Sequence, residues 1–367
     1  MKIALFTSSR ADFGIYLPLL KALKGDSFFE LHIMAFGTHL SEIHGNTVDQ
    51  IIADGFDITF RIDTMPESDL PVAISQAMGK TIIDFAEIWN TQTYELVIAL
   101  GDRYEMFAAC SSIVPFGIPI THIHGGETTL GAIDDCFRHC ITQMSTYHFT
   151  TTDLYRRRVI ELKGNDNHVY NVGALSIDNL MSLSFYSIQE FRHKFNIDLN
   201  IPTILITFHP ETVDFKHNEF YVKELIAALW KIQDYQFIIT MPNADTMGNM
   251  IREQLAKFIS KNKQAIGIES FGTLGYLSCM KNCSMMLGNT SSGFVEASYF
   301  NKYVINLGDR QKGRIITDNI FNCEINEECI VAAVENYKNY IPGSEPGIYG
   351  DGNTARKIIE ILKNANA

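Results

Sequence analysis

The sequence lacks the features that mark membrane, secreted and nucleic-acid-binding proteins. No uninterrupted apolar stretch approaches the roughly 18 residues that a membrane span needs. The apolar segment Ile3 to Phe6 is followed at once by Arg10 and Asp12, so it is too short for a signal peptide. Acidic residues outnumber basic ones, 42 to 30, which gives a net charge of -12 and no basic footprint for nucleic acid. We therefore expect a cytoplasmic protein that binds neither a membrane nor a nucleic acid.

Motifs for disulfides, metals and common cofactors are also missing. The 7 cysteines are an odd number and form no C-x-x-C unit, which disfavours a disulfide framework or a zinc ribbon. Cys136, His139 and Cys140 share one face of a predicted helix, but no second ligand pair accompanies them, so we expect no metal. Neither G-x-G-x-x-G nor a Walker A motif occurs, and we expect no nucleotide cofactor.

The 367 residues, 46% of them hydrophobic, are enough for two globular domains. In the first half, short apolar runs alternate with amphipathic stretches such as 16–23. This alternation predicts a parallel, doubly wound sheet, and the run 96–100 is apolar on both faces, as a buried parallel strand should be. The predicted strands are 2–6, 30–36, 96–100, 119–123, 147–150 and 169–172.

The same rhythm restarts after a polar stretch. Strands are predicted at 203–208, 236–240, 266–268, 284–287 and 303–306, and helices at 219–232, 245–259 and 354–363. We therefore expect an α/β protein of two Rossmann-like domains facing a cleft, with ligands bound beyond the carboxyl ends of the strands. The expected domains are 1–172, 173–350 and a C-terminal helix in 351–367 that packs back on the first domain.

Carboxylates follow two predicted strands of the first half. Asp102 comes after strand 96–100 and Gly101, and Glu127 comes after strand 119–123 and two glycines. Asp134 lies a short segment further on. Carboxylates that converge in a cleft raise one another's pKa, so that one can act as an acid while another acts as a base. The alternative for Asp102 is a helix cap.

An anion-binding pattern follows the first strand and several strands of the second half. Ser8, Ser9 and Arg10 either meet an anion at a helix N-terminus or cap that helix. His209 follows strand 203–208 and suits proton transfer or phosphate contact. The small-residue loop 288–293, before a helix expected near Phe294, predicts an anion cradle. The other candidates are Glu296 for ribose hydroxyls and the cations of the loop 306–314, among them Arg310 and Arg314.

These motifs in this order resemble the hydrolysing UDP-N-acetylglucosamine 2-epimerases, over nearly the whole chain. The motifs are Ser-Ser-Arg-Ala-Asp, Leu-Gly-Asp-Arg-Tyr-Glu, His-Ile-His-Gly-Gly-Glu, Phe-His-Pro-Glu-Thr, Gly-Asn-x-Ser-Ser-Gly and Asn-Leu-Gly-x-Arg-Gln-x-Gly-Arg. The resemblance implies the GT-B architecture, no cofactor, a UDP-sugar substrate and a homodimer or homotetramer. It also implies a place in sialic acid synthesis for bacterial capsule or surface polysaccharide.

The resemblance also implies roles for particular residues. Asp102, Glu127 and Asp134 correspond to the family's acid–base carboxylates, and His209 to its histidine near the leaving diphosphate. The diphosphate side would be formed by Arg10, Ser291, Ser292, Gly293, Arg310 and Arg314, and ribose would be bound by Glu296. Arg103, Asn243 and Asp245 lie in matching motifs with less defined binding roles. In the implied mechanism UDP leaves by elimination to a glycal, and water then adds with protonation at carbon 2.

Four other functions stay open at this point. One is a hydrolysing epimerase acting on a GDP-linked diacetamido sugar in legionaminic acid synthesis, which would share fold and mechanism. Another is the non-hydrolysing epimerase, which keeps the nucleotide attached. A GT-B glycosyltransferase would need an acceptor site, and a nucleotide-sugar sensor would bind UDP without releasing product.

Overall fold

The chain folds into two α/β units in the computed structural model, which describes residues 1–42, 45–242, 248–337, 340 and 347–365. The first unit comprises Met1–Glu127, Ile133–Ser182 and Gly347–Ala367. The second comprises Thr128–Ala132 and Leu183–Pro346. The boundary expected at residue 172 therefore falls after Ser182, because the helix that ends there packs within the first unit. A five-residue excursion, 128–132, was not foreseen from the sequence.

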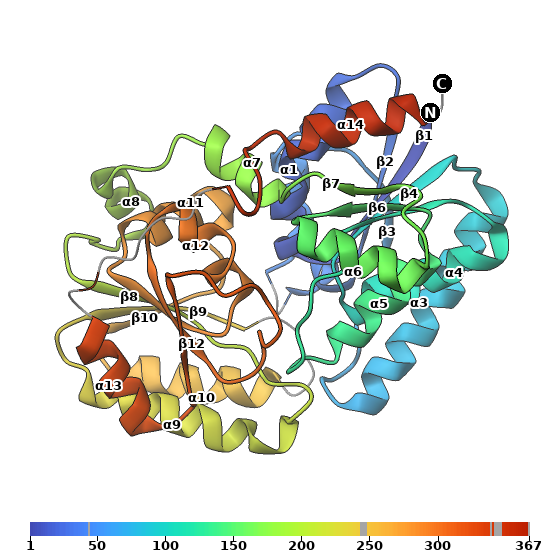
Figure 1. Ribbon diagram of the computed structural model, residues 1–367. Coiled ribbons are helices and arrows are strands. Elements are labelled where there is room, and N and C mark those ends of the chain that lie inside the picture. The colour runs from blue at the N-terminus through green and yellow to red at the C-terminus, as the bar shows by residue number, and fades with distance from the viewer. Residues whose placement is uncertain (43–44, 243–247, 338–339, 341–346, 366–367) are drawn as a thin grey trace. The chain divides into compact units, whose positions relative to one another are not determined.

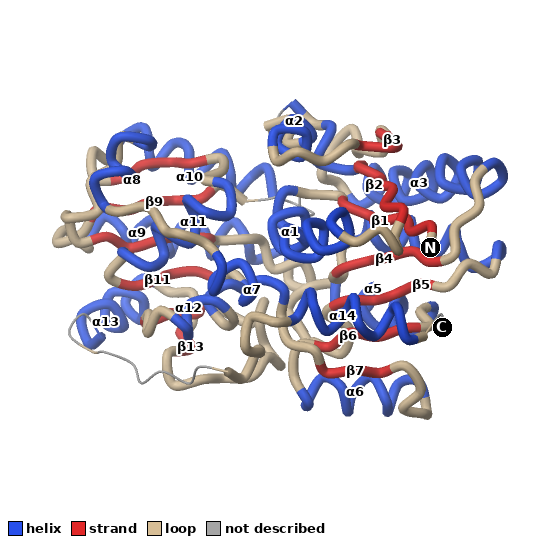
Figure 2. The backbone as a smooth tube through the Cα atoms, turned by 90° about the horizontal axis from the view of Figure 1, so that it is seen from above, coloured by secondary structure: helices blue, strands red, loops and turns tan. Residues whose placement is uncertain are grey.

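The first unit is built on a seven-stranded parallel sheet with the order β3-β2-β1-β4-β5-β6-β7 (Figure 2). The strands are β1 Lys2–Thr7, β2 Glu30–Phe36, β3 Ile58–Ile62, β4 Leu96–Leu100, β5 Ile120–Ile123, β6 Tyr147–Thr150 and β7 Val169–Asn171. The longer helices are α1 Arg10–Gly25, α2 Val48–Ala53, α3 Pro71–Thr91, α4 Tyr104–Ile113, α5 Asp134–Met144, α6 Asp153–Lys163, α7 Leu175–Ser182 and α14 Thr354–Asn364.

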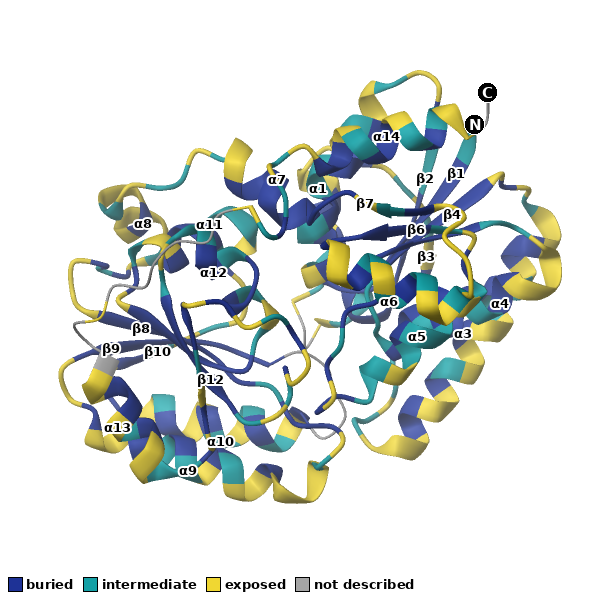
Figure 3. Ribbon diagram, viewed as in Figure 1, coloured by how far each residue is buried: buried dark blue, intermediate teal, exposed yellow. Residues whose placement is uncertain are grey.

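Both faces of this sheet are buried, because alternate residues of the central strands feed two separate cores. Ile3 and Leu5 of β1 belong to the core shared with α1 and α14. Ala4 and Phe6 belong to the opposite core, which contains Phe85 of α3. A strand that is apolar at every position, such as β4, is the sequence signature of this two-sided burial. Figure 3 shows the strands buried and the outward faces of the helices exposed.

The second unit repeats the plan with six parallel strands in the order β10-β9-β8-β11-β12-β13. The strands are β8 Thr203–Thr207, β9 Gln236–Thr240, β10 Ala265–Ile268, β11 Met285–Gly288, β12 Tyr303–Leu307 and β13 Ile320–Cys323. The helices are α8 Ile188–Phe195, α9 Asn218–Lys231, α10 Gly248–Lys261, α11 Gly272–Asn282, α12 Glu296–Tyr299 and α13 Glu327–Tyr337. Alternate residues of β8 again enter different cores, Ile204 and Ile206 on one side and Leu205 on the other.

The expected α/β class and the strands that were predicted are confirmed, most within one residue of their observed ends. Two edge strands, β3 and β13, were missed because their residues are only partly buried and carry no continuous apolar run. The helix expected near Phe294 is found as α12, which begins at Glu296 after a 3-10 turn at Ser291–Gly293 and has only 4 residues. No helix within the described ranges is both long and apolar enough to cross a membrane.

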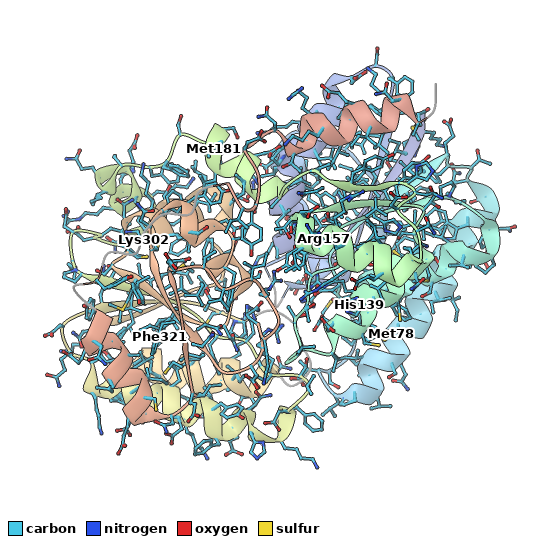
Figure 4. All side chains as sticks on the ribbon, in the orientation of Figure 1. Met78, His139, Arg157, Met181, Lys302 and Phe321 are labelled. Atoms are coloured by element: carbon cyan, nitrogen blue, oxygen red, sulfur yellow. The ribbon has the colours of Figure 1, made fainter. Side chains whose placement is uncertain are left out.

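The C-terminal helix α14 packs against α1 and α7 (Figure 1). Its N-terminus has no side-chain cap of its own. Instead, the buried carboxylate of Asp178 on α7 accepts the backbone N–H groups of Thr354 at 2.9 Å and Ala355 at 2.7 Å. Gly352 lies close by. A Cβ at this position would lie 2.8 Å from Met181 Cγ, and Figure 4 labels Met181 on α7. The Asp178 carboxylate stabilises the start of α14 in two ways: it accepts N–H groups that have no partner within the helix, and its negative charge interacts favourably with the helix dipole.

Asp178→Ala should lower the free energy of unfolding by about 2–3 kcal/mol, because two hydrogen bonds to a charged group are lost and two buried donors are left without partners. Urea unfolding measures the change, and amide hydrogen exchange should show faster opening of residues 354–364. The matched control is Asp351→Ala, which removes an exposed carboxylate 3.0 Å from Lys357 and should cost less than about 1 kcal/mol. Equal effects of the two changes would contradict this account.

Candidate active site

The carboxyl ends of β4 and β5 are fixed to each other by the backbone and by one buried histidine. Gly101 has φ of 83° and donates its N–H to Ile123 O at 3.0 Å. His122 Nε2 lies 2.8 Å from Gly101 O, and Nδ1 lies 3.0 Å from the Thr142 hydroxyl. Burial lowers the pKa of His122 to about 3, so the ring is neutral: Nε2–H donates and Nδ1 accepts. His122 therefore holds the strand ends rather than transferring protons.

Arg138 of α5 joins the two carboxylates that follow these strands. Its Nη2 donates to Asp102 Oδ2, its Nη1 donates to His124 O at 3.0 Å, and the same Nη1 lies 3.7 Å from Glu127 Oε2. The guanidinium side chain is buried, as is Glu127, while Asp102 keeps partial access to solvent. The predicted convergence of Asp102 and Glu127 is therefore found, and a shared cation lies at its centre.

Glu127 is held by more than the arginine. Its side chain is only 2% exposed. Oε1 accepts a hydrogen bond from the Thr151 hydroxyl at 3.0 Å and lies 3.2 Å from His124 Nδ1. A buried carboxylate with this many polar neighbours is fixed in position, as a group that must meet a substrate should be.

Asp134 begins α5, four residues before Arg138, so both side chains project from the same face of that helix. Asp135 and His139 form the next such pair, 3.4 Å apart, and Figure 4 labels His139 on α5. Of the three predicted carboxylates, two meet at Arg138, and the third lies one helical turn from it.

The loop after β1 is organised around Asp12. Ser9 is the N-cap of α1 and forms a capping box with Asp12, so the capping interpretation is confirmed for this serine. The Asp12 carboxylate also accepts the N–H and hydroxyl of Ser8 at 2.9 and 2.8 Å. Burial acts to raise its pKa, yet the His39 ring, 3.8 Å from Oδ1, and hydrogen bonds from Thr7 and Ser8 outweigh burial and lower it. Arg10, the first residue of α1, is half-buried.

Arg103 forms a salt bridge with Glu105. Its Nε and Nη2 donate to the two carboxylate oxygens of Glu105 at 3.2 and 3.0 Å. Glu105 is only 1% exposed, so the pair is a bidentate, largely buried salt bridge. This geometry fits a residue that shapes the loop after β4.

In the second unit, a chain of side-chain amides joins the loops after β8, β11 and β12. His209 N–H donates to Asn289 Oδ1 at 2.7 Å, and Asn289 Nδ2 donates back to His209 O at 2.9 Å. Gln311 Nε2 then donates to Asn289 O at 2.9 Å, and Arg314 Nε donates to Gln311 Oε1 at 2.6 Å. His209 and Arg314, predicted separately from distant motifs, are thus brought into one hydrogen-bonded network.

Glu211 fixes the loop that carries Arg310. Its Oε1 accepts the backbone N–H groups of Asp309 at 2.6 Å and Arg310 at 3.2 Å. A Cβ at Gly308 would lie 2.2 Å from the same oxygen, which explains a glycine there. The Arg310 side chain donates from Nη1 to Pro210 O. The predicted cation loop is therefore tied to the His209 segment through backbone groups.

The small-residue loop after β11 is closely packed. Gly288 has φ of 139°, and a Cβ there would lie 2.0 Å from Thr207 O. Ser292 is 2.7 Å from the Tyr276 hydroxyl, and a Cβ on Gly293 would lie 2.8 Å from Val304 Cγ1. Ser291 stays exposed, and Glu296 at the start of α12 is half-buried. Asn243 and Asp245 lie outside the described residues.

The segment between Glu127 and Ile133 is bound to this same loop region. Leu130 N–H donates to Lys312 O at 2.9 Å, and a Cβ on Gly131 would lie 2.5 Å from the Asp309 backbone. The chain therefore passes from Glu127 into the second unit's cation loop and returns to the first unit just before Asp134.

Sequence reasoning missed Arg138, His124, Thr151, Asn289 and Glu211 as parts of these sites. Arg138 had a signal, since it follows Asp134 at helical spacing, and Asn289 and Glu211 lie inside motifs that were already noted. Nothing in the sequence places Thr151 beside Glu127, because that contact joins two different strand ends. Within the residues that the structure describes, no group of three or more His, Cys, Asp or Glu side chains is arranged to hold a metal ion.

Two doubly wound parallel sheets, one with a carboxylate–arginine cluster and one with a cation loop at its strand ends, define an α/β protein with the GT-B type of fold. The family model described as UDP-N-acetylglucosamine 2-epimerase matches residues 21–363, and the chain belongs to this family.

Similar proteins agree with this membership. The GDP/UDP-N,N'-diacetylbacillosamine 2-epimerase (hydrolyzing) of Campylobacter jejuni is 34% identical over 89% of this chain and 85% of its own length. Polysialic acid biosynthesis protein P7 of Escherichia coli is 31% identical over 100% and 95%. The Methanocaldococcus jannaschii UDP-GlcNAc 2-epimerase, solved with UDP-GlcNAc and UDP, has the same fold, with a TM-score of 0.83 at 18% identity over 99% and 100% of the two chains.

Glu211 generates a pH prediction. Burial raises the pKa of its carboxyl above the ordinary value of 4.5, against the opposing effect of the Asp309 and Arg310 N–H groups. The folded protein therefore binds this proton more tightly than the unfolded chain, and its stability falls as pH rises from about 4.5 through the raised pKa. The Glu211→Gln variant cannot lose this proton, so it does not share the fall in stability with rising pH. The free energy of unfolding of the variant minus that of the wild type should therefore increase between pH 4 and pH 7.

Urea unfolding of both proteins at a series of pH values measures this difference, and other carboxylates cancel in the comparison. Glu219→Gln is the control, because the hydrogen bond from Lys223 lowers the pKa of this exposed carboxyl. Its stability relative to wild type should change in the opposite direction or stay flat. A relative stability of Glu211→Gln that falls with rising pH would rule out the assigned shift.

Proposed function

We propose that the protein is a hydrolysing epimerase that converts UDP-N-acetylglucosamine and water to free N-acetylmannosamine and UDP, for sialic acid synthesis. The observation that carries the proposal is the cluster in which Asp102 and Glu127, both at strand ends, share Arg138. Membership of the UDP-N-acetylglucosamine 2-epimerase family supports the reaction class.

The chemistry requires both an acid–base pair and a stabilised leaving group. The proton at carbon 2 of the sugar is weakly acidic, so its removal must be coupled to departure of UDP. In the proposal Asp102, which retains solvent access, removes or relays this proton as UDP leaves and a glycal forms. Glu127 and Asp134 then serve the hydration, in which water bonds to carbon 1 and carbon 2 is protonated from the other face.

The second unit's residues are proposed to bind the nucleotide. His209, Arg310 and Arg314 stabilise the charge that develops on the leaving diphosphate, which is the electrostatic contribution that such an elimination needs most. The other proposed binding residues are Arg10, Arg103, Asn243, Asp245, Ser291, Ser292, Gly293 and, for ribose, Glu296. We also propose a homodimer or homotetramer as the active form.

A second substrate is favoured by a specific observation. The Campylobacter jejuni relative, at 34% identity, is named for a GDP- or UDP-linked N,N'-diacetylbacillosamine. That sugar carries the same groups at carbon 1 and carbon 2 as the N-acetylglucosamine substrate. The same elimination and hydration could therefore act on it. The alternative is therefore a hydrolysing 2-epimerase of a diacetamido sugar.

A proton NMR time course in deuterated buffer distinguishes these functions. With UDP-N-acetylglucosamine we expect UDP and free N-acetylmannosamine that carries deuterium at carbon 2. Formation of UDP-N-acetylmannosamine would identify the non-hydrolysing reaction instead. Turnover of only UDP- or GDP-linked diacetylbacillosamine would select the alternative substrate, and no turnover of any of these sugars would refute the epimerase proposal.

Asp102→Asn, Glu127→Gln and His209→Ala should each lower kcat by about 100-fold or more, because each removes a proposed proton-transfer or leaving-group residue. Binding of UDP, measured by calorimetry, should survive the two carboxylate changes. Glu219→Gln is the matched control, since it neutralises an exposed carboxylate paired with Lys223 and should leave turnover unchanged. Near-wild-type turnover in all three variants would contradict the site.

A further inference from the structure

His124 has an unusual backbone for its residue type. It follows β5 directly and has φ of 71°, in the left-handed region that non-glycine residues rarely occupy. Such a conformation costs of the order of 1–3 kcal/mol and persists where its surroundings fix it. The surroundings here are the Arg138 guanidinium on its carbonyl oxygen, at 3.0 Å, and Phe149 O, which accepts its N–H at 3.0 Å.

The His124 ring is held against the carboxylate cluster. The residue is 9% exposed, and Nδ1 lies 3.2 Å from Glu127 Oε1. The other ring nitrogen, Nε2, is buried and has no hydrogen-bond partner among the residues that the structure describes. A buried polar atom left unsatisfied costs about 1–3 kcal/mol, so it calls for an explanation such as a ligand.

The neighbouring His122 provides the contrast. Both ring nitrogens of His122 are satisfied by Gly101 and Thr142, as expected for a structural residue. His124 has one nitrogen on a carboxylate and one available, which is the arrangement of a histidine oriented by an acid for proton transfer.

We propose that His124 is a further catalytic residue, the general base of the hydration step. The inference rests on the proposed function. Nδ1–H donates to the Glu127 carboxylate, which leaves a lone pair on Nε2. As the water oxygen bonds to carbon 1 of the glycal, Nε2 takes the water's proton. The electron pair of the carbon–carbon double bond forms the new C–H bond at carbon 2 with the proton of the Asp134 carboxyl, on the other face, and leaves Asp134 as the carboxylate.

The Glu127 carboxylate stabilises the imidazolium that results, and the proton on Nε2 then passes to solvent. This assignment gives Glu127 the part of orienting and stabilising the base, and it separates the two halves of the reaction. Elimination of UDP depends on Asp102, whereas hydration of the glycal depends on His124.

His124→Asn is the discriminating variant. Asparagine tolerates the left-handed backbone and keeps an N–H for Glu127, but it has no counterpart of Nε2. Thr151→Val is the matched control, because it removes a hydroxyl donor to Glu127 Oε1 and leaves the imidazole in place. Circular dichroism and thermal midpoints verify that both variants fold.

With the nucleotide sugar that the wild type turns over, His124→Asn should release UDP and accumulate the glycal, and its hydration of added glycal should fall by about 100-fold with KM little changed. Thr151→Val should accumulate no glycal. Wild-type hydration by His124→Asn, or equal losses in both variants, would overturn the inference and leave His124 only a positioning residue.

A spectroscopic test does not depend on turnover and so separates this inference from the proposed function. In protein labelled with 15N in the histidine rings, the His124 signals are assigned by their absence from the His124→Asn spectrum. We expect a neutral ring with the proton on Nδ1 and an unprotonated Nε2, and a changed Nδ1 shift in Glu127→Gln. A proton on Nε2 would refute the inference even if the epimerase reaction is confirmed.

Discussion

The interaction on which the first unit's site depends is the sharing of one guanidinium by two carboxylates. Asp102 and Glu127 are brought to one edge of the sheet by β4 and β5, and without a cation their charges would repel in a largely buried setting. Arg138 supplies that cation from α5, and its planar fork reaches Asp102, Glu127 and the His124 carbonyl at once. Lysine, with a single point of charge, could not make this set of contacts.

The second unit holds its strand-end loops together with a different kind of contact. Its strand-end loops carry the cations that are proposed to bind an anionic ligand. They are held by amides and backbone groups instead: Asn289 to His209, Gln311 to Asn289, and Glu211 to the N–H groups before Arg310. Through these contacts the backbone that carries Arg310 is held in position.

Close packing explains two glycines in the loops of the second unit. Gly288 and Gly308 combine positive φ with an oxygen near 2 Å from any added Cβ, so only glycine lets the loop after β11 approach the Thr207 carbonyl and the loop after β12 approach the Glu211 carboxylate. His124 shows the opposite case, in which a side chain is retained in a left-handed conformation. Hydrogen bonds with Arg138 and Phe149 hold this strained backbone in place.

The sequence by itself determined the α/β class, most strands and the strand-end motifs. In a parallel sheet buried on both faces, each strand is a continuous apolar run, and polar or turn-forming residues follow it. The edge strands β3 and β13 were not predicted, because half-exposed strands do not form continuous apolar runs. The sequence could also name Asp102, Glu127, His209 and Arg310, each of which lies in the loop that follows a strand. Only the tertiary structure decided that Arg138 lies between two carboxylates, that Thr151 and His124 flank Glu127, and that α14 starts on Asp178. These contacts join segments far apart in the chain, and their geometry depends on side-chain directions that no local pattern encodes.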